Sequence, residues 1–209
     1  MSLLLVVVLL FFSSSCSVSS GQYYVSDDCS SVTQSPCNPL SVYAGNMSQY
    51  NNTIFYFIGT TNISYDIIMT AVKNVTLHGL DQSPSIVGIE ELGATRIFVQ
   101  YSDHVTISNL TIDHCRVEVD SSNSITIFNN AFISFRYIYI TQFIVTTNAF
   151  DLKISSSVFS ADSFGFLGYA VYIQYDPLPA CSSELLHYSL ILTDVTFTVQ
   201  SQMILDMHH

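Results

Sequence analysis

Tryptophan is absent from the 209 residues, and basic residues are scarce: five Lys and Arg stand against 16 Asp and Glu, a formal net charge of −11. Such a chain repels phosphate backbones and anionic membrane surfaces, which excludes nucleic acid as a partner. Charged residues make up only 10% of the chain and hydrophobic residues 49%. This balance excludes a disordered chain and is ample for a hydrophobic core. The length suits one domain better than two.

Good helix formers are also in short supply, because alanine, glutamate, lysine and arginine are all uncommon. Phe and Tyr are abundant, with 14 and 13 copies. Together with many β-branched residues, Ser and Asn, they favour strands and turns and predict an all-β fold. No segment contains about 18 consecutive apolar residues, so we expect no membrane span.

The N-terminus has the pattern of a secretory signal peptide over residues 1–20. An apolar run, Leu3 to Phe12, is too short to span a bilayer and is followed by mostly small residues as far as Gly21. The pattern predicts cleavage near Ser19 or Ser20 and an extracellular, secreted protein. The region before the run lacks the usual Lys or Arg, and a buried N-terminal strand is the alternative interpretation.

Five Asn-x-Ser/Thr sequons agree with export. We predict glycosylation at four of them: Asn46, Asn51, Asn62 and Asn74. The fifth, Asn109, falls at a predicted bend between two strands, where its side chain is needed for the turn. We therefore predict low occupancy at that sequon.

Four cysteines follow the leader, and an even number in an exported chain indicates disulfides. Cys29 and Cys37 lie close together in the sequence, and we predict a bond between them. Cys115 and Cys181 are far apart, so they either pair or remain buried free thiols. Neither CxxC nor a Cys/His zinc spacing occurs, and we expect no metal and no cofactor.

A strand–bend–strand motif recurs along the chain. Its clearest copy is Val105-Thr106-Ile107-Ser108-Asn109-Leu110-Thr111-Ile112, and the copies begin at Val75, Val105, Ile125, Ile138, Leu152 and Leu190. The first and third positions are always apolar, which indicates a half-buried strand, and the fifth usually holds a turn residue. The irregular spacing excludes a propeller or an ankyrin-like array. We interpret the Ile138 copy as a different strand of the coil that begins at Ile125.

These copies predict a right-handed parallel β-helix over residues 53–209. Stacked coils bury a continuous core that no single coil could bury alone. Residues 21–52 are rich in Ser, Asn, Cys and Pro and predict an irregular N-terminal cap. We expect Asn109 and Asn129 to stack in a column. The chain stops soon after the Phe197 strand with no evident cap, so we expect it to belong to a longer or assembled protein.

The Val-Thr-Ile-Ser-Asn-Leu-Thr-Ile unit and its copies, over roughly residues 53–199, resemble the right-handed β-helix, pectin-lyase-like superfamily. The chain is also similar to extracellular β-helix repeat proteins of animals that have no assigned activity. Some members of the superfamily are polysaccharide lyases or hydrolases, and others are adhesins, so the resemblance implies fold more than function. The Asn-Thr-Asp, Gly-Asp-Asp, Gly-His-Gly and Arg-Ile-Lys motifs of polygalacturonase-like members do not occur. Leu152-Lys153-Ile154 is the nearest approach to the last motif.

We therefore predict a non-catalytic interaction or structural domain whose partner is an extracellular glycan or protein. A polysaccharide-active lyase or hydrolase is the alternative. A β-sandwich receptor domain is less consistent with the sequence, because Trp is absent and no pair of cysteines has the expected intersheet arrangement. We assign no catalytic residue.

Three sets of residues were candidates for chemistry or binding. Asp113-His114-Cys115-Arg116 combines an acid, a base and a cation, or else forms a polar turn. Glu90-Glu91 and Asp27-Asp28 are either calcium ligands or solvated loop acids. A third set of aromatic residues could line a sugar-stacking surface, although strand alternation buries about half of them: Tyr23, Tyr24, Tyr50, Phe55, Tyr56 and Phe57.

Overall fold

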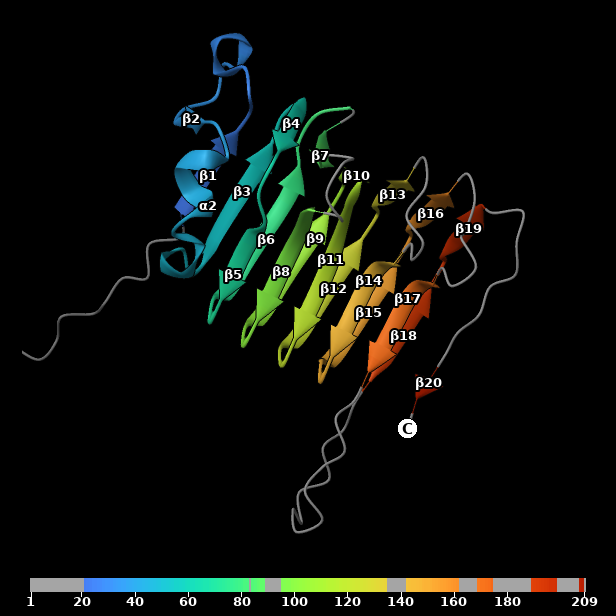
Figure 1. Cartoon of the computed structure of the whole chain (residues 1–209). Helices are drawn as coiled ribbons and strands as arrows, with labels where there is room; N and C mark the ends of the chain where they lie inside the picture. The colour runs from blue at the N-terminus through green and yellow to red at the C-terminus, as the bar shows by residue number, and fades with distance from the viewer. Residues whose placement is uncertain are drawn as a thin grey trace, which may run out of the picture.

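The computed structural model describes residues 21–82, 84–88, 95–134, 142–161, 169–174, 189–198 and 207–208. In this part of the chain, three parallel sheets run along a common axis and form a parallel β-helix, as the sequence predicts (Figure 1). Each full coil passes through sheet A, sheet B and sheet C and then returns to sheet A one rung further on. The predicted signal peptide lies outside the described residues.

The strands of the three sheets are as follows. Sheet A comprises β2 (Cys37–Asn38), β1 (Gly21–Val25), β3 (Thr53–Phe57), β6 (Lys73–Gly79), β9 (Asp103–Ser108), β12 (Asn123–Phe128), β15 (Phe150–Ser155) and β18 (Leu190–Thr193). Sheet B comprises β4 (Thr60–Ile63), β7 (Ser85–Gly88), β10 (Thr111–Asp113), β13 (Ala131–Ser134), β16 (Val158–Ala161) and β19 (Thr196–Thr198). Sheet C comprises β5 (Ile67–Thr70), β8 (Thr95–Gln100), β11 (Cys115–Asp120), β14 (Gln142–Thr147), β17 (Tyr169–Gln174) and β20 (Met207–His208).

The register of sheet A confirms the repeat. The first residues of five motif copies stand in one column, in the order Val75, Val105, Ile125, Leu152 and Leu190. These strands are separated by different numbers of residues, yet the apolar alternation holds them in phase, since a slip of one residue would turn every core side chain outward. The predicted strand at Ile138 lies outside the described residues.

The core consists of inward-facing side chains stacked in columns. Six residues predicted to point inward are all buried: Val105, Ile107, Ile125, Ile127, Leu152 and Ile154. In sheet B, the rings of Phe132 and Phe159 stack with centroids 4.8 Å apart, and those of Phe159 and Phe197 with centroids 5.3 Å apart. Rung stacking therefore places like residues on like residues, which is how a narrow coil obtains a continuous core.

Left-handed residues make the corner between sheets A and B. Asn109, Asn129, Ser156 and Asp194 all have positive φ, between 48° and 57°, as their fifth position in the motif predicts. Gly79 occupies the same position without positive φ. Glycine is needed here because the backbone of the next coil comes very close: a Cβ on residue 79 would lie 1.9 Å from the carbonyl oxygen of Asn109.

The N-terminal end of the core is closed by residues 21–52. Strand β1 pairs in parallel with β3, and the short helices α2 (Ser41–Ala44) and η2 (Met47–Gln49) follow. Leu40, Tyr43 and Met47 are buried, and the Tyr43 ring contacts the buried Phe55 edge-on, with centroids 5.4 Å apart. The predicted disulfide is present between Cys29 and Cys37, just before this buried layer.

Candidate functional site

The Asp113–Arg116 cluster is divided among three environments. Nδ1 of His114 lies 2.8 Å from Oδ1 of Asp113 at the corner between sheets B and C. The next residue, Cys115, points into the core, and Arg116 lies on the outward face of sheet C. Alternation along β11 places Cys115 and Arg116 on opposite faces of sheet C, so the four side chains do not form one joint site.

The sequence left open whether Cys115 pairs with Cys181 or remains a buried free thiol. In the structure Cys115 is a buried, free thiol. Burial raises the pKa of the Cys115 thiol to about 12, so almost none of the nucleophilic thiolate exists at neutral pH. The other cysteine of the pair, Cys181, lies outside the described residues.

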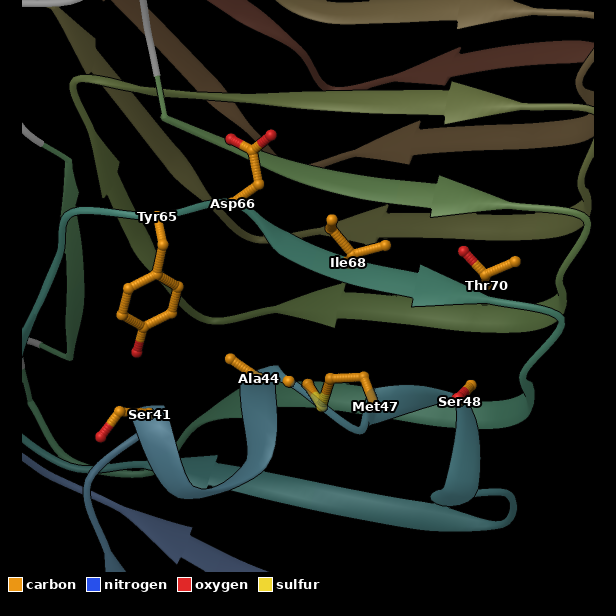
Figure 2. Close-up of a pocket in the computed structure, with 9 residues that line it drawn as sticks. Ser41, Ala44, Met47, Ser48, Tyr65, Asp66, Ile68 and Thr70 are labelled. Atoms are coloured by element: carbon orange, nitrogen blue, oxygen red, sulfur yellow. The ribbon is translucent and has the colours of Figure 1, made fainter.

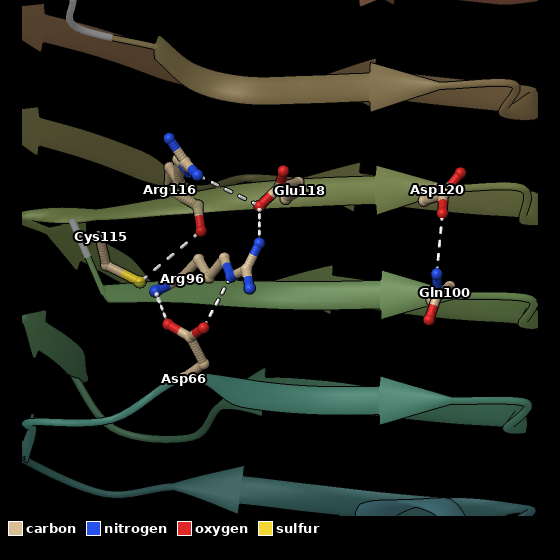
Figure 3. A network of polar contacts seen from close by, with 7 residues as sticks. All are labelled: Asp66, Arg96, Gln100, Cys115, Arg116, Glu118 and Asp120. Carbon is tan, nitrogen blue, oxygen red and sulfur yellow. Dashed lines mark hydrogen bonds and ion pairs between the residues drawn. The ribbon is translucent and has the colours of Figure 1, made fainter. Parts of the chain in front are cut away.

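Polar side chains from three rungs meet on the outward face of sheet C (Figure 3). Arg96 donates from Nε to Oδ2 of Asp66 and from Nη1 to Oε2 of Glu118, both across 2.7 Å. Arg116 donates from Nη2 to the same oxygen of Glu118 across 3.3 Å. The hydrogen bonds to Glu118 and Asp66 raise the pKa of the Arg96 guanidinium above its usual value. Arg96 is therefore a permanent cation that links three rungs of the solenoid.

Two further contacts extend this array along the strands. The guanidinium of Arg96 lies over the Phe98 ring, 4.7 Å from its centroid, a cation–π arrangement. Gln100 donates from Nε2 to Oδ2 of Asp120 across 2.9 Å. We define the sheet C array as Asp66, Arg96, Phe98, Gln100, Arg116, Glu118 and Asp120. The ion-paired side chains of the array are about one-third exposed. The array therefore contributes little to the free energy of unfolding, and its main effect is to orient these side chains.

A groove of about 510 Å³ adjoins the array at Asp66, between the N-terminal cap and strand β5 (Figure 2). Apolar atoms of Ala44, Met47 and Ile68 line it, and Ile68 is 45% exposed. Hydroxyl and carboxyl groups surround these apolar atoms: Ser41, Ser48, Tyr65, Asp66 and Thr70. The sequence did not predict this groove, because its two walls come from the cap and from strand β5 of the first coil.

The other candidates from the sequence have local partners. Oδ2 of Asp27 accepts hydrogen bonds from the backbone and side-chain nitrogens of Asn62, at 2.8 and 2.9 Å. Asp28 caps the short helix η1 (Cys29–Ser31). Glu90 and Glu91 lie outside the described residues. In the described part of the chain, no group of three or more His, Cys, Asp or Glu side chains is arranged to hold a metal ion.

The predicted aromatic surface separates into buried and outward rings. Phe55 and Phe57 are in the core, while Tyr23 and Tyr50 pack edge-on to each other within the cap. Two outward rings remain, and Tyr24 and Tyr56 stack on each other with centroids 5.4 Å apart. Each ring covers one face of the other, and the Tyr56 ring also meets the His78 ring edge-on, with centroids 5.8 Å apart.

Comparison of the chain with protein-family models, with curated proteins and with solved structures found no match. Within the described ranges, no helix combines the length and the apolar character needed to cross a membrane. Since a fold alone does not determine a function, we infer the function from the geometry of the chain itself.

Proposed function

We propose that the chain is a secreted, glycosylated, non-catalytic interaction domain of pectin-lyase-like type, and that it binds an extracellular protein on the outward face of sheet C. The predicted leader, the sequons and the Cys29–Cys37 disulfide support secretion. Glycosylation at Asn46, Asn51, Asn62 and Asn74 is part of this proposal, and all four side chains are exposed.

One observation carries the non-catalytic assignment. Every described carboxylate of the sheet C array, from Asp66, Glu118 and Asp120, accepts a hydrogen bond from an arginine or an amide of the same array. Polysaccharide cleavage needs a carboxyl group or a base that can exchange a proton with the substrate. An array whose acids and cations are committed to one another is instead a rigid surface suited to binding.

The composition of the face favours a protein over a glycan as ligand. Arginine, tyrosine and phenylalanine are among the residues enriched at protein interfaces, and Arg96 and Phe98 lie on this face, with Tyr65 in the adjoining groove. The exposed Ile68 supplies an apolar anchor beside the fixed charges. A protein segment matches this face if one of its apolar side chains fills the groove and its neighbouring polar side chains contact the sheet C array.

The experiment compares two variants of the secreted protein as bait for extracellular proteins and for a glycan array. Ile68→Asp places a charge in the groove, and Val158→Asp is the matched control, an exposed apolar residue on the outward face of sheet B. We expect one protein partner to be retained by the wild type and by Val158→Asp and lost with Ile68→Asp. Glycan binding that disappears with Ile68→Asp would assign a glycan to this face instead.

Catalysis is tested separately with polygalacturonate, with and without calcium. We expect no product, because the catalytic motifs of polygalacturonase-like members do not occur in the chain. Turnover that vanishes in Asp113→Ala or Arg116→Ala would replace the binding assignment with the lyase or hydrolase alternative.

A further inference from the structure

Strand β5 is the last strand of sheet C at the cap end of the described chain, and it pairs with β8 alone. The register shows which of its backbone groups face away from β8. The backbone nitrogen of Ala71, directly after β5, donates to the carbonyl of Gln100 on β8 across 2.9 Å. Backbone groups of alternate residues point to opposite edges of a strand. Those of Ile68 and Thr70 therefore point to the edge that lacks a neighbouring strand.

The backbone groups at this edge have no hydrogen-bond partner in the described part of the chain. Neither the nitrogen nor the carbonyl of Ile68 or Thr70 is bonded to a described residue. Both residues line the groove of about 510 Å³ whose opposite wall is the cap (Figure 2). A row of unpaired N–H and C=O groups is a template for the pairing of another strand.

The other two sheets are protected at the same end of the solenoid. Strand β1 pairs with β3 and covers the edge of sheet A. In sheet B, Oδ2 of Asp27 accepts a hydrogen bond from the backbone nitrogen of Asn62 across 2.8 Å, so a carboxylate occupies an N–H group of the edge strand β4. The cap therefore opposes strand pairing at sheets A and B and leaves the backbone groups of β5 facing the groove.

The side chains of the groove define the segment that fits. Ile68 is 45% exposed on β5, and Ala44 and Met47 add apolar atoms from the opposite wall, so the groove takes an apolar side chain. Among the described lining residues, Asp66 is the one that carries a charge, and the whole chain carries −11. Basic residues on either side of the apolar one are therefore favoured over acidic residues.

We infer that the protein partner binds by strand addition: an extended segment, with an apolar residue between basic ones, pairs with β5 and lengthens sheet C by one strand. This inference rests on the proposed function and specifies how its groove is filled. Main-chain hydrogen bonds to Ile68 and Thr70 supply affinity, and the groove selects the apolar side chain. The glycan proposed at Asn46 begins outside the groove, because Asn46 is not part of the lining.

Calorimetry of the secreted protein with synthetic peptides tests strand addition. The probes are end-blocked heptapeptides, Lys-Thr-Thr-X-Thr-Thr-Lys, in which X is Val, Leu, Ile, Phe or Tyr. We expect at least one of them to bind tighter than about 1 mM. N-methylation of alternate amides removes the donors along one edge of the peptide. Because only one edge faces β5, one alternate set should lower the affinity about tenfold or more and the other should leave it unchanged.

A pair of variants at Thr70 tests the same bonds from the side of the protein. Thr70→Pro removes an N–H group that faces the groove and takes no part in the ladder with β8, a position where edge strands accept proline. The affinity for the tightest peptide should fall about tenfold. Thr70→Val is the matched control, because it keeps the N–H group and the shape of the side chain, and its affinity should equal that of the wild type. Thermal unfolding checks that Thr70→Pro is folded, and the N-methylated peptides report on the same hydrogen bonds in the unaltered protein.

Three outcomes would overturn strand addition. They are no binding of any peptide tighter than about 1 mM, equal affinities for the two N-methylated sets, and equal affinities of folded Thr70→Pro and the wild type. The proposed function fails in a different way. A protein partner that is lost with Ile68→Asp but retained by Thr70→Pro keeps the binding face on sheet C and removes strand addition alone, whereas a partner that Ile68→Asp retains removes the face itself.

Discussion

Asn129 donates a hydrogen bond from Nδ2 to Oδ1 of Asn109 across 2.8 Å, and both residues have left-handed backbone at the same corner of successive coils. On its other side, Nδ2 of Asn109 lies 3.4 Å from Nε2 of His78. The column predicted from the sequence is therefore present, and the Asn109 amide sits between two partners.

This arrangement predicts which sequon remains unmodified. Nδ2 of Asn109 is the atom that would carry the sugar, and because this atom faces Nε2 of His78, a glycan there would displace His78. We expect low occupancy at Asn109 and high occupancy at Asn46, whose side chain is exposed at the start of η2. Site-resolved mass spectrometry of protein secreted from a eukaryotic host measures both. Full occupancy at Asn109 in folded protein would contradict the assigned role of the amide column.

A single buried amide, that of Asn130, lies inside the same corner, and its loss should be costly. Oδ1 of the buried Asn130 accepts from the backbone nitrogen of Leu110 across 2.9 Å, and Nδ2 donates to the carbonyl of Ile107 across 2.8 Å. Asn130→Ala leaves both backbone groups without a partner in the core, so we expect a loss of about 2–4 kcal/mol in the free energy of unfolding.

Urea unfolding of the secreted protein measures this loss, and the neighbouring outward amide provides the control. Asn129→Gly keeps the left-handed backbone without strain, so it should cost about 1 kcal/mol or less. Equal losses at the two positions would show that the buried amide does not support the corner.

Backbone strain can be relieved at Ala71. Its φ is 56° at the corner between sheets C and A, a conformation that costs a residue with a Cβ about 1–2 kcal/mol. Ala71→Gly removes this strain but gives the unfolded chain more freedom, so the net stabilisation expected is about 0.5–1 kcal/mol. Ala131→Gly, within strand β13, should instead destabilise by a similar amount. Thermal unfolding should shift in opposite directions, and a shift of the same sign in both variants would contradict this explanation.

Cys115 should resist thiol reagents in the native state. With a pKa raised to about 12 by burial, its thiolate fraction at pH 8 is on the order of one in ten thousand, and reactivity appears only as pH rises towards that value or as the chain unfolds. The Cys181→Ser variant leaves Cys115 as the free thiol to be followed. Labelling with a chromogenic disulfide should be slow in buffer and complete in guanidinium chloride. Rapid labelling of the folded protein would show that the thiol is accessible.

The solenoid, its inward residues and the cap disulfide were predictable because they depend on local patterns. Alternation at Val105 and Ile107 determines which side of a strand is buried, and Asn at the fifth position marks a left-handed corner. The short separation of Cys29 and Cys37 made their pairing the simplest choice. These properties follow from a few neighbouring residues, whichever rung lies above or below.

The sheet C array and the groove beside Asp66 were decided only by the tertiary structure. Arg96 meets Asp66 and Glu118 across sequence separations of 30 and 22 residues, and the sequence has no fixed repeat length from which such pairs could be computed. The register of each rung emerges when its apolar residues stack on those of the previous rung and the backbone ladder closes, whatever the length of the connecting segment. Outward side chains then become neighbours as a consequence of core packing. For this reason the amino-acid pattern determined the inside of the molecule, and the stacking of rungs determined which groups share its surface.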